Sequence, residues 1–90
     1  MEDDAVNIPI EDALDLHPFA PGDILSVVEE YLAAAHEAGF AEIRLIHGRG
    51  QGVQRAAIQR LLRGHELVET FWDAPESHLG ATVVRLRPAD

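Results

Sequence analysis

A chain of 90 residues without cysteine is long enough for one domain, and it excludes a disulfide framework or a thiolate metal site. No apolar run approaches the roughly 20 residues that a membrane span needs, and residues 1–4 (MEDD) lack the layout of a signal peptide, so we expect a cytoplasmic protein with no membrane contact. The formal net charge of −9 argues against nonspecific nucleic-acid binding through bulk charge.

The hydrophobic pattern predicts an acidic, partly disordered arm over residues 1–12 and one folded domain over residues 13–88. In chain order the predicted elements are a strand at 13–17, a helix at 21–38, a strand at 42–47, a helix at 52–63, and strands at 67–72 and 81–86. A helix between two strands is typical of a βαβ crossover, so the first two strands should be parallel. We therefore expect an α/β two-layer sandwich of order β-α-β-α-β-β with a mixed four-stranded sheet.

Both predicted helices have an apolar face and residues that are typical of helix ends. Pro21 suits a first helical turn because its missing N–H has no partner there, and Gly39 and Gly64 suit helix ends. The apolar stripe of the first helix is Ile24, Val28, Tyr31, Leu32 and Ala35. The inner face of the second helix is predicted as Val53, Ala57, Ile58, Leu61 and Leu62. An i, i+4 row is predicted on its outer face: Arg55, Gln59 and Arg63.

The segment between the second strand and the second helix carries the strongest functional signal. Gly48, Gly50 and Gly52 follow His47, and a strand that stops at spaced glycines and restarts as a helix exposes backbone N–H groups that hold anions such as phosphate. The G-x-G-x-G spacing differs from the dinucleotide fingerprint G-x-G-x-x-G. A tight turn that only needs positive φ is the alternative, but three glycines with Arg49 beside them favour an anion site.

Fixed positive charge gathers around this loop. Residues 1–43 hold eleven acids and no Lys or Arg, whereas residues 44–90 hold five acids and seven arginines. The guanidinium fork suits phosphate oxygens. Alternatively, arginine usage follows genome composition and the acids form a solvated face, which would also suit a protein partner. Five of the arginines lie within residues 44–63, namely Arg44, Arg49, Arg55, Arg60 and Arg63.

Asp15 and His17 are the second candidate cluster. At i, i+2 on a strand they share one face, about 7 Å apart, and a carboxylate beside a histidine can orient it for acid–base work. The alternative is a pair of structural hydrogen bonds at the sheet edge. Since the first two strands should be parallel, His17 and His47 both lie at carboxyl ends, where α/β sheets bind ligands. The two clusters should therefore face one crevice.

Other groups carry weaker signals. Ser26 and Ser77 lack a nucleophile-elbow context, and no His and carboxylate spacing matches a structural zinc site. Phe71 and Trp72 either stack a nucleic-acid base or form a core phenylalanine beside a partly exposed tryptophan; the second interpretation is favoured.

Leu14-Asp15-Leu16-His17, followed thirty residues later by the His47–Arg55 segment HGRGQGVQR, resembles the small MutS-related (Smr) domain. Residues 80–84 match the closing strand of that family, so the resemblance covers residues 14–86. It implies a fold similar to the C-terminal domain of bacterial translation initiation factor 3 and a DNA-nicking or RNA-cleaving endonuclease. The resemblance also assigns sites: Asp15 and His17 to the D-L-H active-site motif, His47, Gly48, Gly50 and Gly52 to the H-G-x-G-x-G loop, and Arg55 to the basic residue that closes it.

The expected function is thus a nucleic-acid endonuclease, acting on DNA or RNA as a monomer. Phosphate would lie on the N–H groups of residues 48–52, with Arg49 and Arg55 neutralising the charge that grows on its oxygens, and His17 would move a proton, oriented by Asp15. RNA cleavage by the 2′-OH requires no metal, whereas water attack on DNA would favour Mg²⁺ or Mn²⁺ near Asp15. The alternatives are a non-catalytic module that binds RNA or protein, and a binder of small phosphates.

Overall fold

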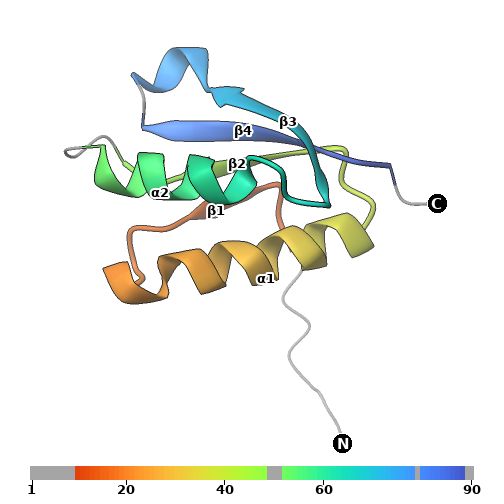
Figure 1. Ribbon diagram of the computed structural model, residues 1–90, viewed down its shortest axis with the longest axis horizontal. Coiled ribbons are helices and arrows are strands. Elements are labelled where there is room, and N and C mark those ends of the chain that lie inside the picture. The colour runs from red at the N-terminus through yellow and green to blue at the C-terminus, as the bar shows by residue number, and fades with distance from the viewer. Residues whose placement is uncertain (1–9, 49–51, 79, 89–90) are drawn as a thin grey trace, which may run out of the picture.

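The computed structural model describes residues 10–48, 52–78 and 80–88 (Figure 1). It confirms the predicted order of elements, with a 3₁₀ turn (Pro21–Asp23) before the first helix and another (Pro75–Ser77) before the last strand. The predicted acidic arm falls mainly on residues 1–9, outside the described part of the chain, and stays a prediction. Among the described residues no helix is long and apolar enough to cross a membrane. The elements are β1 (Ala13–Asp15), α1 (Ile24–Glu37), β2 (Glu42–Ile46), α2 (Val53–Leu62), β3 (Val68–Asp73) and β4 (Ala81–Leu86).

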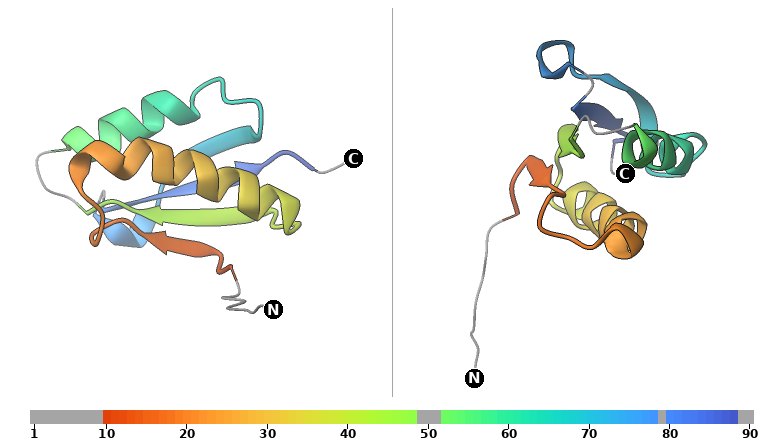
Figure 2. Two further views of the ribbon diagram at one scale, coloured as in Figure 1. Left: turned by 90° about the horizontal axis from the view of Figure 1, so that it is seen from below. Right: turned by 90° about the vertical axis from the view of Figure 1, so that its left-hand side faces the viewer.

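The sheet is mixed, as predicted, with strand order β1-β2-β4-β3. β1 and β2 are parallel, and β4 runs antiparallel to both of its neighbours. Both helices cover the same face of this sheet (Figure 2). The register pairs Asp15 with Ile46, Ile46 with Ala81, and Thr82 with Asp73, so the carboxyl ends of β1, β2 and β3 meet at one edge of the sheet, beside the start of β4.

One main hydrophobic core lies between the sheet and the helices. Strand alternation places Ile43 and Leu45 of β2 beside Val84 of β4 on the inner face, because side chains of a strand point alternately to its two sides. Val28 and Leu32 of α1 and Ile58 of α2 close over them without solvent exposure. The predicted stripe of α1 is buried throughout, namely Ile24, Val28, Tyr31, Leu32 and Ala35.

Two predictions for α2 are wrong. Val53 is 68% exposed because each residue turns a helix by about 100°, which places Val53 about 140° round the axis from the buried Ile58. The same geometry places Arg55 and Gln59 only about 60° and 100° from Ile58. Both side chains therefore face β3 and donate hydrogen bonds to Asp73 instead of forming an outer row. Only Arg63 of the predicted row is exposed, and its guanidinium carbon lies 5.8 Å from the centroid of the Phe71 ring.

The two strands at the edges of the sheet differ slightly from prediction. β1 ends at Asp15 rather than His17. The Leu16 N–H still donates to the Ile46 carbonyl, but Pro18, the next residue that would face β2, has no N–H to donate. β3 extends to Asp73, which the sequence pattern placed in a loop. Phe71 packs against the core while Trp72 is half exposed on the outer face, with Arg85 over its ring, as the packing interpretation predicted.

Tyr31 ties α1 to the segment before β1, and this contact predicts an alkaline transition. Its hydroxyl donates to the Glu11 carbonyl, and burial, with Asp12 and Glu11 nearby, raises the pKa of Tyr31 to about 12. The fold therefore favours the neutral phenol. This stabilisation is complete below pH 10 and is lost as the pH rises from 10 to 12. We expect the free energy of unfolding to fall by about 2 kcal/mol over that range.

Urea titrations at pH 8 and pH 11.5 measure this effect, with Tyr31→Phe as the matched variant. The variant lacks the ionisable group, so its free energy of unfolding should change less between the two pH values. An equal change in both proteins would show that Tyr31 is not the titrating group.

Candidate functional site

Asp15 and His17 form a hydrogen-bonded, solvent-exposed pair at the end of β1. The backbone N–H of His17 donates to Asp15 Oδ1 at 3.0 Å, and the ring Nδ1 lies 2.6 Å from the same oxygen. These two hydrogen bonds, the backbone one first, lower the pKa of the Asp15 carboxyl. Because a carboxylate only accepts, Nδ1 carries the hydrogen, and Nε2 is the nitrogen available to a substrate. The turn after β1 brings the pair closer than the 7 Å expected for a regular strand.

Gly48 lies directly against that available nitrogen. Its φ is +80°, and a Cβ added to Gly48 would lie 2.9 Å from His17 Nε2. The backbone N–H groups of His47 and Gly48 both donate to the Gly80 carbonyl, which anchors the start of the loop to the start of β4. His17 and the described start of the glycine loop thus lie close together, whereas the shared crevice stays a prediction.

The rest of the glycine loop is described only at its far end. Gly52, with φ +79°, is the N-cap residue of α2. The predicted phosphate-binding residues Arg49 and Gly50 lie outside the described residues. Positive φ at Gly48 and Gly52 shows that the turn itself needs glycine at both positions, as the tight-turn alternative held. The anion site therefore stays a prediction.

His47 is buried, and both of its ring nitrogens are partnered. Nδ1 lies 2.9 Å from the Gly48 carbonyl oxygen and Nε2 lies 2.9 Å from Thr82 Oγ1. Only 8% of the residue is exposed. This geometry is that of a residue that holds the loop, unlike His17, whose ring is open to solvent.

Arg55 is engaged by a residue that the sequence analysis missed. Its Nε and Nη2 each donate to one oxygen of Asp73, both at 2.7 Å, and Gln59 Nε2 donates to Asp73 Oδ1 at 3.0 Å. The Arg55 hydrogen bonds are the main cause of the lowered pKa of Asp73. Because strand residues alternate between the two faces of a sheet, Asp73 lies on the same inner face as the core residue Phe71. A carboxylate on that face needs a polar partner, which only α2 could supply.

The Arg55–Asp73 pair predicts a loss of stability in acid. Because the fold lowers the pKa of the Asp73 carboxyl, ionisation of Asp73 stabilises the folded protein. This stabilisation is present above the pKa of an unfolded aspartate, about 3.9, and is lost as the pH falls through the lower pKa of the folded state. Asp73→Asn should reduce the free energy of unfolding by about 1–2 kcal/mol at pH 7, since the pair is about one-third exposed.

Once the pH has fallen through the folded pKa of Asp73, the variant and the parent should converge, because Asp73 is then protonated. Chemical unfolding at pH 7 and at a second pH below that folded pKa tests this prediction. Glu76→Gln is the matched control, because Glu76 pairs with Arg44 on the outer face and is more exposed. A constant difference between Asp73→Asn and the parent at both pH values would contradict the ion-pair explanation.

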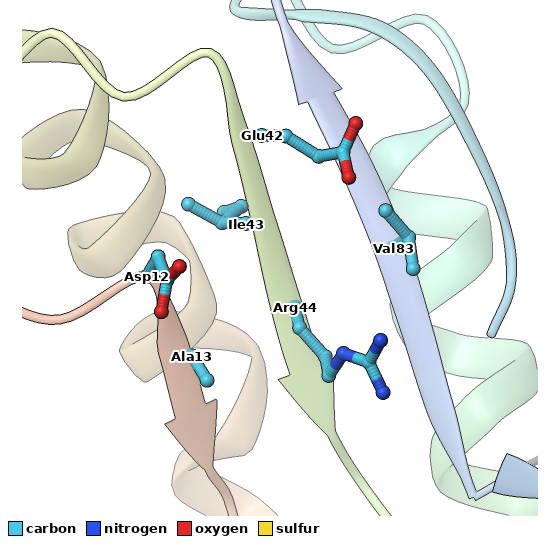
Figure 3. A pocket seen from close by; sticks show the side chains of 6 residues that line it. All are labelled: Asp12, Ala13, Glu42, Ile43, Arg44 and Val83. Atoms are coloured by element: carbon cyan, nitrogen blue, oxygen red, sulfur yellow. The ribbon is translucent and has the colours of Figure 1, made fainter. Parts of the chain in front are cut away.

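The cavity drawn in Figure 3 lies elsewhere on the sheet. It encloses about 170 Å³ near the amino ends of β1 and β2, and Asp12, Glu42 and Arg44 line it. Among the residues that the structure describes, no three His, Cys, Asp or Glu side chains gather into a metal site.

Comparison with known proteins identifies relatives in both sequence and structure. Endonuclease MutS2 of Pelotomaculum thermopropionicum is 44% identical over 79 residues, which make up 86% of this chain and 10% of that protein. Endonuclease MutS2 of Thermus thermophilus is 42% identical over 77 residues, or 83% of this chain and again 10% of the relative. The chain thus spans about a tenth of the length of the curated relatives it matches.

Solved structures of related domains have a similar fold. The crystal structure of the Smr domain of Thermus thermophilus MutS2 matches with a TM-score of 0.81 and 39% identity, over 87% of this chain and all of that domain. YdaL, a stand-alone small MutS-related protein from Escherichia coli, has the same fold, with a TM-score of 0.78 and 24% identity over 88% of this chain and 66% of YdaL. The sequence model of the Smr domain matches residues 14–87, and we conclude that the chain belongs to the Smr domain family.

Proposed function

We propose that this domain is a nucleic-acid endonuclease that cleaves phosphodiester bonds, with His17 as the group that moves a proton. One observation carries the proposal. The Asp15 carboxylate holds His17 Nδ1 at 2.6 Å, and the opposite nitrogen faces the start of the glycine loop. An oriented, solvent-exposed imidazole beside a candidate phosphate site has the arrangement that acid–base catalysis of phosphoryl transfer needs. The relatives named endonuclease MutS2 support it.

On RNA, His17 Nε2 would accept the proton of the 2′-OH as the 2′-oxygen attacks phosphorus. The P–O5′ bond would break, the 5′-oxygen would take a proton from water, and the His17 imidazolium would release its proton to solvent. The products are a 2′,3′-cyclic phosphate and a 5′-hydroxyl. On DNA, water would take the place of the 2′-OH, and Mg²⁺ or Mn²⁺ near Asp15 would assist. In both reactions Asp15 fixes the ring and stabilises the imidazolium that forms.

The phosphate would lie on the backbone N–H groups of the glycine loop and on the first turn of α2. Glycine at positions 48, 50 and 52 has no side chain that could cover that backbone, and Arg49 would add positive charge. Arg55 contributes orientation more than net charge, because Asp73 neutralises it. Its Nη1 makes no hydrogen bond with any described residue, which leaves one edge of the guanidinium for a phosphate oxygen.

A second candidate function is a binding module that does not cleave. The net charge of −9 and the neutralised Arg55 favour it, because both weaken the electrostatic attraction that nucleic-acid binding normally uses. Its partner would be RNA, or a protein that docks on the acidic half of the chain.

Cleavage of end-labelled DNA and RNA by the purified protein separates these functions. Each substrate is tested with Mg²⁺, with Mn²⁺ and with EDTA. A 2′,3′-cyclic phosphate end with EDTA present identifies the RNA reaction, whereas a metal-dependent nick in supercoiled plasmid identifies the DNA reaction. Binding without cleavage of any substrate would replace the enzyme proposal with the binding module.

A further inference from the structure

Five side chains form one hydrogen-bonded chain from α2 to the glycine loop. Arg55 holds both oxygens of Asp73 at 2.7 Å, and Gln59 Nε2 joins Asp73 Oδ1 at 3.0 Å to Thr82 Oγ1 at 3.1 Å. Thr82 Oγ1 in turn lies 2.9 Å from His47 Nε2. Three elements and one loop contribute: Arg55 and Gln59 come from α2, Asp73 from β3 and Thr82 from β4, and His47 lies directly after β2.

The chemistry of these groups assigns every hydrogen in the chain. A carboxylate only accepts, so Gln59 reaches Asp73 through its NH₂, whose second hydrogen goes to Thr82 Oγ1. Thr82 is fully buried, and its own hydrogen needs an acceptor. His47 Nε2 is that acceptor. On the other side of the ring, the Gly48 carbonyl only accepts, so Nδ1 carries the hydrogen.

A protonated His47 would break this pattern. Both ring nitrogens would then donate, and Thr82 Oγ1 would receive hydrogens from His47 and from Gln59. The hydroxyl hydrogen of Thr82 would be left with no acceptor among the described residues, in a fully buried position. The hydrogen-bonded chain is therefore complete only when His47 is neutral with its hydrogen on Nδ1.

We propose that Thr82, Gln59 and Asp73 are positioning residues that hold His47 as the neutral Nδ1–H ring and so fix Gly48 against His17. The link is short, because the His47 Nδ1–H donates to the Gly48 carbonyl, and a Cβ added to Gly48 would lie 2.9 Å from His17 Nε2. The effect on catalysis rests on the proposed endonuclease function, whereas the ring state of His47 does not. Arg55 is held by the same chain of hydrogen bonds, through Asp73.

Long-range ¹H–¹⁵N NMR of histidine-labelled protein at pH 7 tests the ring state without any substrate. We expect His47 to show a protonated Nδ1 and an unprotonated, hydrogen-bonded Nε2. A hydrogen on Nε2, or on both nitrogens, would overturn the proposal. His17 is an internal reference, because its exposed Nε2 lacks the buried hydroxyl partner.

Three threonine variants test the positioning role. Thr82→Val removes the hydroxyl at nearly constant volume, Thr82→Ser retains it, and Thr70→Val changes an exposed threonine of β3. In Thr82→Val the Nε2 signal should move towards that of an unbonded nitrogen, and kcat should fall about tenfold to a hundredfold with KM nearly unchanged. Thr82→Ser and Thr70→Val should keep both the signal and the rate of the parent.

The possible failures are distinct. If the parent cleaves no substrate, the endonuclease proposal fails while the NMR result still decides the ring state. If the His47 Nε2 signal of Thr82→Val equals that of the parent, Thr82 does not hold the ring. If the kcat of Thr82→Val equals that of the parent, holding the ring does not matter for cleavage. Either result overturns the positioning role. If Thr82→Val does not fold, the parent spectrum alone still decides the ring state, and comparison of Gln59→Glu with the parent tests the role.

Discussion

Replacement of His17 by alanine should lower cleavage by about a hundredfold to ten-thousandfold, the usual contribution of a positioned general acid or base. The side chain of His17 is 62% exposed, and its ring hydrogen-bonds to Asp15. The free energy of unfolding should therefore change by no more than about 0.5 kcal/mol. Affinity for nucleic acid should also persist, because the backbone N–H groups of the loop are untouched.

His36→Ala is the matched control, since His36 lies in the last turn of α1, at the end of that helix away from His17. Rates are compared at saturating substrate, with filter binding to confirm affinity. Asp15→Asn should show a smaller loss, because an amide oxygen still accepts from Nδ1 but lacks the charge that stabilises the imidazolium. The assignment fails if His17→Ala cleaves as fast as His36→Ala.

The pH dependence of the rate follows from the same pair. The His17 N–H groups, backbone first, lower the pKa of Asp15, so Asp15 stays a carboxylate from pH 5 to pH 8. Ionisation of Asp15 should therefore contribute no change to the pH–rate profile between pH 5 and pH 8, in cleavage rates measured across that range.

The pattern of the sequence predicted the architecture well because the fold repeats simple periods. Alternation in β2 and β4 and the stripe of α1 encode which face meets the core. The parallel pairing of β1 and β2 then follows from the crossover helix, and with it the meeting of His17 and Gly48. These features depend on local pattern and chain topology alone.

The parts that prediction missed depend on long-range pairing of side chains. Whether Arg55 faces solvent or β3 depends on the rotation of α2 on the sheet, which the spacing of Arg55, Gln59 and Arg63 does not define. The partner, Asp73, stands eighteen residues away at a strand end that could equally have been a loop. The position of His47 beside the glycines made it a candidate, but its buried hydrogen-bond partner, Thr82, lies thirty-five residues later in the chain.

Replacement of Gly48 by alanine should separate stability from activity. Its φ of +80° lies in the left-handed region, so alanine there should lower the free energy of unfolding by about 1–2 kcal/mol. The new Cβ would also lie 2.9 Å from His17 Nε2. Because Nε2 is at the tip of an exposed side chain, the ring swings away at little cost in stability. Cleavage, however, should fall about a hundredfold, since the imidazole leaves its position.

Gly64→Ala provides the matched control. Gly64 has nearly the same φ, +82°, after α2, but a Cβ there meets no atom within 4 Å. The two variants should therefore lose similar free energies of unfolding, measured by urea titration, while only Gly48→Ala loses activity. Equal activity losses in both variants would mean that lowered stability, rather than contact with His17, explains the effect.

A double-mutant cycle completes the test of the His17–Gly48 contact. Once His17 is alanine, the Cβ at position 48 has no ring to displace, so Gly48→Ala should cause no further loss of cleavage while its cost in stability remains. If the effects of the two substitutions on the cleavage rate are not additive while their effects on the free energy of unfolding are, the two residues act as one catalytic unit. Additive rates would mean that Gly48 acts through some other group, and the contact between the two clusters would then have no catalytic role.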